Sequence, residues 1–527
     1  MQSEKVERLF VDFILNEIGP SEEKEKDRNE KYNLVKQIMQ NALILNYPEY
    51  IPHIFLYGSF SIKTYLKDSD IDITIILENK ESHEIKIDIS NVLINNILQL
   101  IKSSFEDYNN KMQSNIFTDI NIILADINLL KCQIDSIPLD ISLNNFYGLL
   151  KIIFNNCLFE KIDKEKDNNI NSIILKRSIS LIKAWCYYEG NLIGSNIGLM
   201  ASCALELLTL NLINTNYKNI KNEIDAFFLF FNFINNIDFN NSIMTLFGQI
   251  TKDDYFYDKN SNREEHFWYI NKNRKEEFLF NLNEVKELVK KMDKSKEILL
   301  QNESKYIFHD KLFNIIDPTN DSNNLGKSIN YHSFSKMKGA FQYMQKELNK
   351  INKIKQIDDP FLYINSLLKL FNTSLSMNFI GLFINYLNLP KIYIFSKSKE
   401  SFGHNILNVD KDEVLKFNKL FNIETNEKSE EEKKEENIYE EEEEEEEEDE
   451  DEDNEENINI NKIKSIKNIN AKYQKFEIII NYKLMNQLFE VNKKINDNIE
   501  FYEKLNNIAE QNFKEIVDFM KKYKFII

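Results

Sequence analysis

The sequence predicts an α+β protein, with a sheet-bearing region in its first 145 residues and a mainly helical region after it. Two observations carry this prediction. Short runs of β-branched residues are confined mostly to the first region, and helix-type periodicity dominates the remainder. With 527 residues, the chain is long enough for two or three domains with apolar cores.

The first expected elements are two helices between residues 4 and 43. Pro20 and Ser21 followed by acidic residues are typical of a helix start. Strands that alternate with helices come next, because short apolar runs lie between turn residues. The expected strands cover residues 53–59, 70–77, 120–127, 130–135 and 138–143.

Helical periodicity governs the region after the strands. Two strongly apolar helices are expected in residues 170–212, and the helical pattern continues to about residue 247. The polar, charged stretch 251–305 indicates an insertion with at least one exposed helix. A turn-rich loop then leads into a helix that begins near Ser333, and a further helix follows Pro360.

The net charge of −19 comes from one segment. Between Glu424 and Glu456 there are 23 acidic residues and three lysines, a local charge of −20, which leaves about +1 for the rest of the chain. Such a run cannot bury itself and is expected to be a disordered, low-complexity segment. Beyond it, the sequence predicts a strand at residues 475–482 and amphipathic helices.

The cysteines and the N-terminus indicate an intracellular protein. The four cysteines show no metal or redox spacing. The N-terminus has no signal-peptide pattern, and no apolar run approaches ~18 residues. We therefore expect a nuclear or cytoplasmic protein with no membrane partner.

The stretch FLYGSFSIKTYLKDSDIDITIIL, residues 55–77, carries the strongest chemical signal. Asp70 and Asp72 are two residues apart in an expected strand, so their side chains point to the same side. Two such carboxylates repel unless a cation lies between them, and oxygen ligands favour Mg²⁺, with Mn²⁺ as an alternative. Gly58 lets the backbone approach a ligand, and Ser59 offers a hydroxyl and backbone N–H groups to a phosphate. A metal site beside a phosphate site suits a nucleoside triphosphate with its magnesium.

A third carboxylate would complete a two-metal site, and Asp140 in the expected strand IPLDISL supplies it. Each part alone is common, since D-x-D pairs and Gly-Ser turns occur on many surfaces. Their combination in this order is far more specific. The sequence therefore predicts that Asp70, Asp72 and Asp140 are the catalytic residues and the metal ligands.

This constellation resembles the nucleotidyltransferase superfamily that includes poly(A) polymerases and terminal uridylyltransferases. GSFSIKTYLKDSDIDIT and ADINLLKCQIDSIPLDISLNN look like the carboxylate-bearing segments of a plant-type group of noncanonical poly(A) polymerase-like proteins. LKRSISLIKAWCYYEGNLIGSNIGLMASCALELL and DPTNDSNNLGKSINYHSFSKMKGAF resemble that group's central-domain helices and nucleotide-recognition loop. The resemblance covers roughly residues 5–350.

The resemblance implies a polymerase-beta-like palm with a mixed sheet and a mainly helical central domain of the PAP/OAS1 substrate-binding type. With the composition, it divides the chain into N-terminal helices that pack on the central domain (1–50), the palm (51–150), the central domain with its insertion (151–400), the acidic segment (424–460) and a C-terminal part of unknown role (461–527).

The resemblance also assigns nucleotide-binding residues. Lys183 would neutralise the triphosphate, and Ser202 would lie near the nucleotide. Asn323 and Asn324 would belong to the recognition loop, and Asn323 stands where uridylyl-adding relatives often carry histidine, which favours ATP. Cys203 stands where the family usually has a tyrosine that stacks on the base, and losing such a contact costs about 1–3 kcal/mol.

The expected function is template-independent transfer of AMP from ATP to an RNA 3′ end. Two alternatives stay open: uridylyl transfer by the same site, and a catalytically silent member of the fold that serves as an RNP scaffold. No added RNA-recognition module is visible in the sequence. A protein partner could bind the acidic segment or the C-terminal helices, and the acidic segment could instead compete with RNA.

Overall fold

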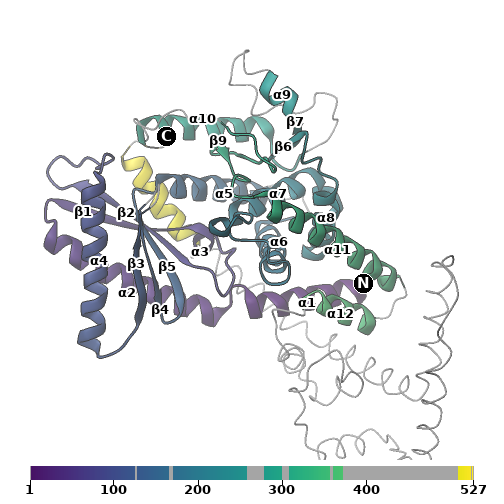
Figure 1. Ribbon diagram of the computed structural model, residues 1–527, viewed down its shortest axis with the longest axis horizontal. Helices are drawn as coiled ribbons and strands as arrows, with labels where there is room; N and C mark the ends of the chain where they lie inside the picture. Colours follow the sequence, from purple (N-terminus) through teal and green to yellow (C-terminus); the bar gives the residue numbers. More distant parts are fainter. Residues whose placement is uncertain are drawn as a thin grey trace, which may run out of the picture. The chain divides into compact units, whose positions relative to one another are not determined.

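A five-stranded mixed sheet and a helical region make up the part of the chain that the structure describes (Figure 1). This computed structural model describes residues 2–124, 128–164, 170–257, 278–299, 308–356, 360–371, 509–523 and 525. The chain divides into two compact units, and the described residues belong to the unit formed by residues 1–374 and 492–527.

The sheet has the strand order β1-β2-β5-β4-β3. Strands β2 and β5 are parallel, and the other neighbouring pairs are antiparallel. The mixed sheet with helices confirms the predicted α+β class. The strands are β1 (Tyr50–Tyr57), β2 (Ile71–Asn79), β3 (Phe117–Ile123), β4 (Leu129–Ile134) and β5 (Ile137–Leu143).

Alternation along the strands separates an apolar face of the sheet from a polar one. Ile71, Ile73 and Ile75 of β2 belong to a buried core that also contains residues of α2 (Glu22–Asn46) and α4 (Asn91–Met112). Because successive side chains of a strand point to opposite faces, Asp72 and its same-face neighbours lie on the other side of the sheet. The apolar core thus decides which face receives the carboxylates.

The N-terminal helices divide between the sheet and the helical region. Helix α1 (Gln2–Ile18) contacts helices of the helical region, whereas α2 contacts β1 and α4. We expected both helices on the helical region. Helix α2 lies against the sheet instead because Val35, Met39 and Leu43 on one of its faces are buried in the core under the strands.

Helices dominate the region after the sheet. None of the helices that the structure describes has the length and apolar character needed to cross a membrane. The remaining helices are α3 (Gly58–Ile62), α5 (Phe146–Lys164), α6 (Ser172–Ala184), α7 (Ser202–Asn216), α8 (Glu223–Asn235), α9 (Lys252–Tyr257), α10 (Leu282–Leu299), α11 (Tyr331–Lys355) and α12 (Pro360–Lys369), with a π-helix η1 (Trp185–Glu189) and 3₁₀ turns η2 (Ser195–Ile197) and η3 (Tyr217–Asn219).

One segment of the helical region differs from the sequence-based expectation. The helical pattern was expected to continue to about residue 247, but β6 (Ser242–Thr245) and β7 (Gly248–Thr251) form a hairpin. Gly248 has φ +117°, a conformation that favours glycine and allows the tight turn. A second short pair, β8 (Ile316–Asp317) and β9 (Asn320–Asn324), forms inside the expected turn-rich loop.

A C-terminal helix at residues 509–522 returns to the sheet. Its Phe519 packs on His53 and Phe55 of β1, with ring centroids 4.9 Å apart in both cases. In Figure 1 this helix lies between the sheet and α5. The acidic segment 424–460 and the strand expected at 475–482 lie outside the described residues.

Candidate active site

Three carboxylates meet on the polar face of the sheet. Asp72 of β2 and Asp140 of β5 are directly opposite each other on adjacent parallel strands. Asp70 lies immediately before β2, two residues from Asp72 and on the same face. One carboxylate oxygen from each of the three lies within 4.8 Å of the others. Among the described residues, no other group of His, Cys, Asp or Glu meets this spacing.

The carboxylates destabilise one another's charges. Burial, followed by the charges of Asp70 and Asp140, raises the pKa of Asp72 well above its ordinary value. Burial also raises the pKa of Asp140, against the effect of a hydrogen bond from Lys131. A divalent cation would relieve this repulsion, and an all-oxygen donor set suits magnesium or manganese. The residues present therefore fit a metal site.

Lys131 is a charged neighbour of the site that the sequence-based reasoning missed. It lies on β4 directly opposite Asp140, and its ammonium is 2.5 Å from Asp140 Oδ2. A signal was available, because the turn Asp135–Ser136 in a tight hairpin pairs Ile134 with residue 137 and so residue 131 with residue 140.

Gly58 closes one side of the carboxylate cluster. It has φ +70°, and a Cβ atom at this position would be 1.9 Å from Asp72 Oδ2. Because Tyr57 pairs with Asp72 across β1 and β2, the following Gly58 must pass close to that carboxylate. Glycine is needed here for both backbone conformation and space. Ser59 follows at the start of α3 and lines the same cavity as Asp70 and Asp72.

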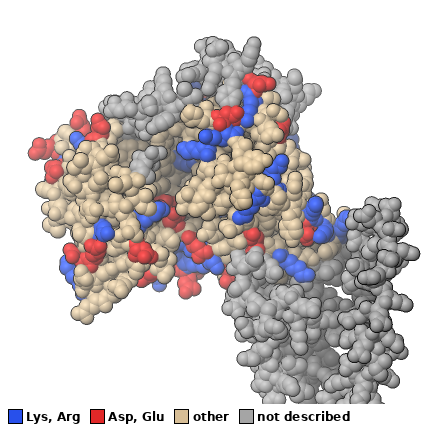
Figure 2. Space-filling view, in the orientation of Figure 1, with Lys and Arg blue, Asp and Glu red and all other residues tan. Residues whose placement is uncertain are grey.

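A cavity of about 940 Å³ extends from the carboxylates into the helical region. The face of the molecule that Figure 2 shows is hollowed, and Lys and Arg side chains lie beside the hollow. Asp140 joins the site through its contact with the other carboxylates rather than as a lining residue. The cavity brings together eight of the predicted residues: Gly58, Ser59, Asp70, Asp72, Lys183, Ser202, Asn323 and Asn324.

Lys183 connects the helical region to the sheet region. Its side chain is buried, which excludes an ammonium extended into bulk solvent. Its Nζ donates to the carbonyl of Thr64 at 3.4 Å and lies 3.9 Å from Glu206 Oε1. Its charge also lowers the pKa of Asp72, although burial and the other aspartates outweigh it. The predicted phosphate-binding lysine therefore lies in the cavity wall close to the carboxylates.

The two predicted asparagines make different contacts in the cavity wall. Asn324 is buried, and its amide donates to His309 O and Asn314 Oδ1 while accepting from the N–H groups of Ile315 and Gly326. These four hydrogen bonds hold together the loop in which Asn324 lies. Asn323 donates to Asp317 Oδ2 at 3.1 Å and accepts from Lys327 Nζ at 3.1 Å.

The sequence-based reasoning also missed the ion pair between Lys151 and Asp317 in the cavity wall. Lys151 Nζ of α5 lies 3.5 Å from Asp317 Oδ2, beside Cys203. Burial lowers the pKa of Lys151, but Asp317, Cys203 and Glu206 together outweigh burial and raise it. A single lysine in the apolar run LLKIIF was the available signal, the same kind that marked Lys183.

Two family models match the chain. Residues 10–152 match the model described as poly(A) RNA polymerase, mitochondrial-like, central palm domain. Residues 170–374 match the PAP/OAS1 substrate-binding domain. Together the models account for more than half of the chain. Residues of both matched segments line the cavity.

Solved structures that are similar to this chain include Cid1 poly(U) polymerase, which is 15% identical with a TM-score of 0.41 over 66% of this chain and 95% of that chain. Cid1 in complex with the UTP analog UMPNPP is 15% identical with a TM-score of 0.43 over the same shares. A cytoplasmic RNA terminal U-transferase is 14% identical with a TM-score of 0.41, covering 66% and 94%.

Comparison with curated protein sequences finds no match. The first matched segment carries the three carboxylates, and both segments contribute to the cavity. The two family models establish the family. The chain belongs to the noncanonical nucleotidyltransferases.

Proposed function

We propose that this chain is a template-independent RNA nucleotidyltransferase that adds AMP from ATP to an RNA 3′ end by a two-metal mechanism. One observation carries the proposal: Asp70, Asp72 and Asp140 converge at one end of a cavity large enough for a nucleotide. Ligand sites have volumes of roughly 300–1,000 Å³, and this cavity lies within that range.

The chain's residues divide the work of holding the nucleotide and the metal ions. Asp70 and Asp72 would bind both ions, and Asp140 would bind the catalytic one. Magnesium bound there would neutralise charge on the phosphates and favour ionisation of the attacking hydroxyl. Lys183, with a buried ammonium in the same cavity, would neutralise part of the triphosphate. Ser59 would donate its hydroxyl to a terminal phosphate.

The reaction is an in-line displacement at phosphorus. The 3′-hydroxyl oxygen of the RNA forms a bond to the α-phosphorus of ATP, and the bond from that phosphorus to the bridging oxygen breaks. Pyrophosphate takes the electron pair and leaves. Asp140 would accept the hydroxyl proton.

The preference for ATP rests on Asn323. Its side chain lines the cavity, and an asparagine amide can bond the edge of adenine. The same site would support uridylyl transfer if the base were read differently. The RNA 3′ end and the nucleoside triphosphate are the proposed partners, and the proposed location is the nucleus or the cytoplasm.

Primer extension tests the proposal. Purified full-length protein would be incubated with a labelled oligo(A) RNA, magnesium and each of the four nucleoside triphosphates separately. The double variant Asp70→Ala/Asp72→Ala serves as the control. We expect a ladder with ATP in the wild type and a loss of more than about 1,000-fold in the variant, because no carboxylate pair remains to hold the metal ions.

Three other outcomes would change the proposal. A ladder with UTP alone would make the chain a terminal uridylyltransferase. Extension that survives in the double variant would remove the aspartates from catalysis. If a folded protein extends RNA with no nucleotide, in magnesium or in manganese, the scaffold function is favoured. The absence of a stacking tyrosine at Cys203 points the same way.

A further inference from the structure

Residues 66–70 form the loop that carries Asp70 to the start of β2. The loop makes its own turn, because the N–H of Ser69 donates to the carbonyl of Leu66 at 2.9 Å and Ser69 Oγ accepts from the N–H of Leu66 at 3.0 Å. Asp70 itself lies outside the strand ladder, so strand pairing does not fix its position as it does for Asp72.

A buried arginine from α2 holds this loop. Arg28 is 2% exposed, and its Nη2 donates to the carbonyl oxygens of Lys67 and Ser69, both at 2.8 Å. The second of these carbonyls belongs to the residue immediately before Asp70. The contact spans 39 to 41 residues of sequence, so the helix acts on the loop from outside it.

Two aromatic rings hold the guanidinium in place, and a carboxylate holds one of the rings. It lies over the ring of Tyr65 at 4.7 Å and the ring of Phe60 at 5.8 Å. Tyr65 is itself held by Glu25 of α2, whose Oε2 accepts from the tyrosine hydroxyl at 2.7 Å. Burial lowers the pKa of Arg28, while Tyr65, Glu25 and Asp70 act in the opposite direction, which puts Asp70 within electrostatic reach of the guanidinium.

Stability alone does not explain an arginine at this position. Its Nη1 is buried and finds no hydrogen-bond partner among the described residues. Burying a charge is costly, and apolar replacements of buried charged groups are often neutral or stabilising. What arginine offers is a planar, rigid group that can bond two carbonyls at once, which the flexible point charge of lysine does less well.

Among the described residues, further hydrogen bonds from neighbouring elements attach the loop only as far as residue 68. The N–H of Lys67 donates to the carbonyl of Ile18 at 2.7 Å, and Tyr188 of η1 donates its hydroxyl to Asp68 Oδ2 at 2.7 Å. Both act at or before residue 68. The carbonyl of Ser69 is held by Arg28, directly beside the metal-binding carboxylate.

We propose that Arg28 is a positioning residue of the catalytic centre, which fixes the Asp70 carboxylate relative to Asp72 and Asp140 through the loop 66–70. The catalytic consequence rests on the proposed function, but the effect on the metal site does not. Misplacing a catalytic group by about 1 Å can cost about 100-fold in rate, so small motions of this loop would matter.

The test compares Arg28→Lys with Arg177→Lys in the full-length protein. Arg177 is a matched control, because it is also a buried arginine and bonds Asp12 and Glu223 away from the cavity. Three readouts are needed: the thermal midpoint, Mn²⁺ affinity by isothermal titration, and kcat and KM for primer extension. If Arg28→Lys does not fold, Arg28→Gln, which removes the buried charge and keeps a donor, takes its place in all three.

We expect Arg28→Lys to weaken Mn²⁺ binding by about tenfold and to lower kcat by about 100-fold with little change in the KM for ATP. Arg177→Lys should lower the thermal midpoint and leave Mn²⁺ affinity unchanged. Unchanged Mn²⁺ affinity and kcat in folded Arg28→Lys would overturn the proposal. Weakened Mn²⁺ binding in a protein whose wild type extends no RNA would sustain the positioning role and refute the proposed function.

Discussion

At the scale of single residues, Gly58 and Asp72 share a space that has no room for a side chain on Gly58. A Cβ there would meet Asp72 Oδ2 at 1.9 Å in a backbone conformation with φ +70°. Any larger residue must therefore move either the turn or the carboxylate. The turn is anchored by Ser61 Oγ, which donates to the Gly58 carbonyl at 2.7 Å, so we expect the carboxylate to move.

Gly58→Ala is expected to weaken Mn²⁺ binding and to lower the rate of primer extension by about 100-fold. The reason is displacement of Asp72 from the other carboxylates. Isothermal titration with Mn²⁺ and single-turnover extension would measure the two effects.

Gly339→Ala is the matched control. Gly339 lies inside α11, and a Cβ there would meet no atom within 4 Å. Alanine should stabilise this helix by about 0.5–1 kcal/mol and leave metal binding unchanged. Equal metal affinity in both variants would show that the contact between Gly58 and Asp72 does not constrain the site.

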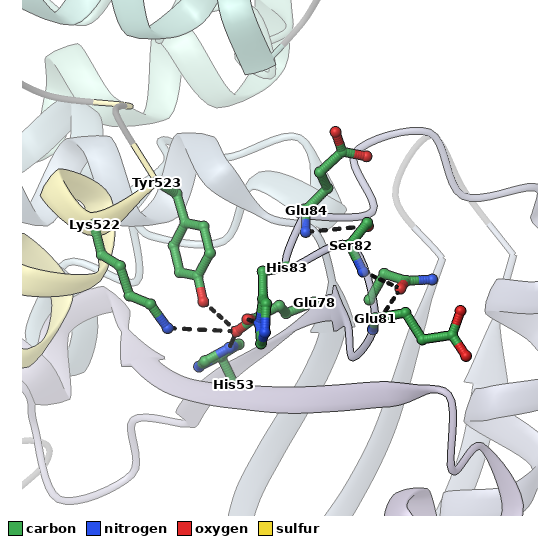
Figure 3. A network of polar contacts seen from close by, with 9 residues as sticks. His53, Glu78, Glu81, Ser82, His83, Glu84, Lys522 and Tyr523 are labelled. Carbon is green, nitrogen blue, oxygen red and sulfur yellow. Dashed lines mark hydrogen bonds and ion pairs between the residues drawn. The ribbon is translucent and has the colours of Figure 1, made fainter.

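At the scale of elements, the C-terminal helix is joined to the sheet by a buried carboxylate (Figure 3). Glu78 lies at the end of β2 opposite to Asp70 and Asp72. It accepts from His53 Nε2 at 2.7 Å, from His83 Nδ1 at 2.9 Å and from the hydroxyl of Tyr523, and Lys522 Nζ lies 3.8 Å away. This cluster links residues far apart in the sequence and should contribute to stability.

The stability of this contact should fall in acid. Burial opposes ionisation of Glu78, but hydrogen bonds from Tyr523, His83 and His53 outweigh it and lower its pKa from 4.5 to about 2. A carboxyl group whose pKa is lower in the folded state stabilises the protein above its unfolded pKa. That stabilisation is lost as the pH falls through the folded pKa. Burial also lowers the pKa of His53, which favours the unfolded state in acid as well.

Glu78→Gln is therefore expected to lower the free energy of unfolding at neutral pH by on the order of 2 kcal/mol. The difference from wild type should shrink between pH 4.5 and about 2, the window set by the shifted pKa. Thermal unfolding at a series of pH values measures this. Glu81→Gln, at an exposed position of the turn that follows β2, should differ little from wild type. A pH-independent difference for Glu78→Gln would contradict the assignment.

At the scale of the whole molecule, negative charge is concentrated outside the described part of the chain. Residues 424–456 carry a charge of −20, and the net charge of the whole chain is −19. The rest of the chain, with about +1, has little electrostatic attraction for RNA, and the acidic segment would add repulsion or compete for basic side chains.

Deleting residues 424–456 is expected to strengthen binding of single-stranded RNA by about tenfold at low salt, with little effect at high salt, because exposed charges are screened. Fluorescence anisotropy at about 50 mM and 500 mM NaCl would measure it. A variant of equal length with the acidic residues replaced by Asn and Gln separates charge from length. RNA affinity that is unchanged in both variants would exclude the competing role.

The sequence by itself predicted the sheet region and the three carboxylates that meet on its polar face. The i, i+2 spacing of Asp70 and Asp72 places them on one face of any strand, and the apolar residues between and beyond them select the polar face. Asp140 was predicted from the need of a two-metal site for a third carboxylate and from the order of the motif. Local periodicity predicts the pair Asp70 and Asp72, but it does not show that the strand of Asp140 lies beside the strand of Asp72. The hairpin at 242–251 escaped prediction because short apolar runs fit a helix as well as a strand.

Tertiary structure decided the neighbours of the site. Arg28 reaches the Asp70 loop from a helix about 40 residues earlier, and Lys151 meets Asp317 across 166 residues. The contact between Tyr523 and Glu78 spans 445 residues. No local pattern encodes such contacts, because they arise when separate elements bury their apolar faces together and bring polar side chains within bonding distance. The carboxylate pair of the site was thus predictable from short-range spacing, and the contacts that support the site were not.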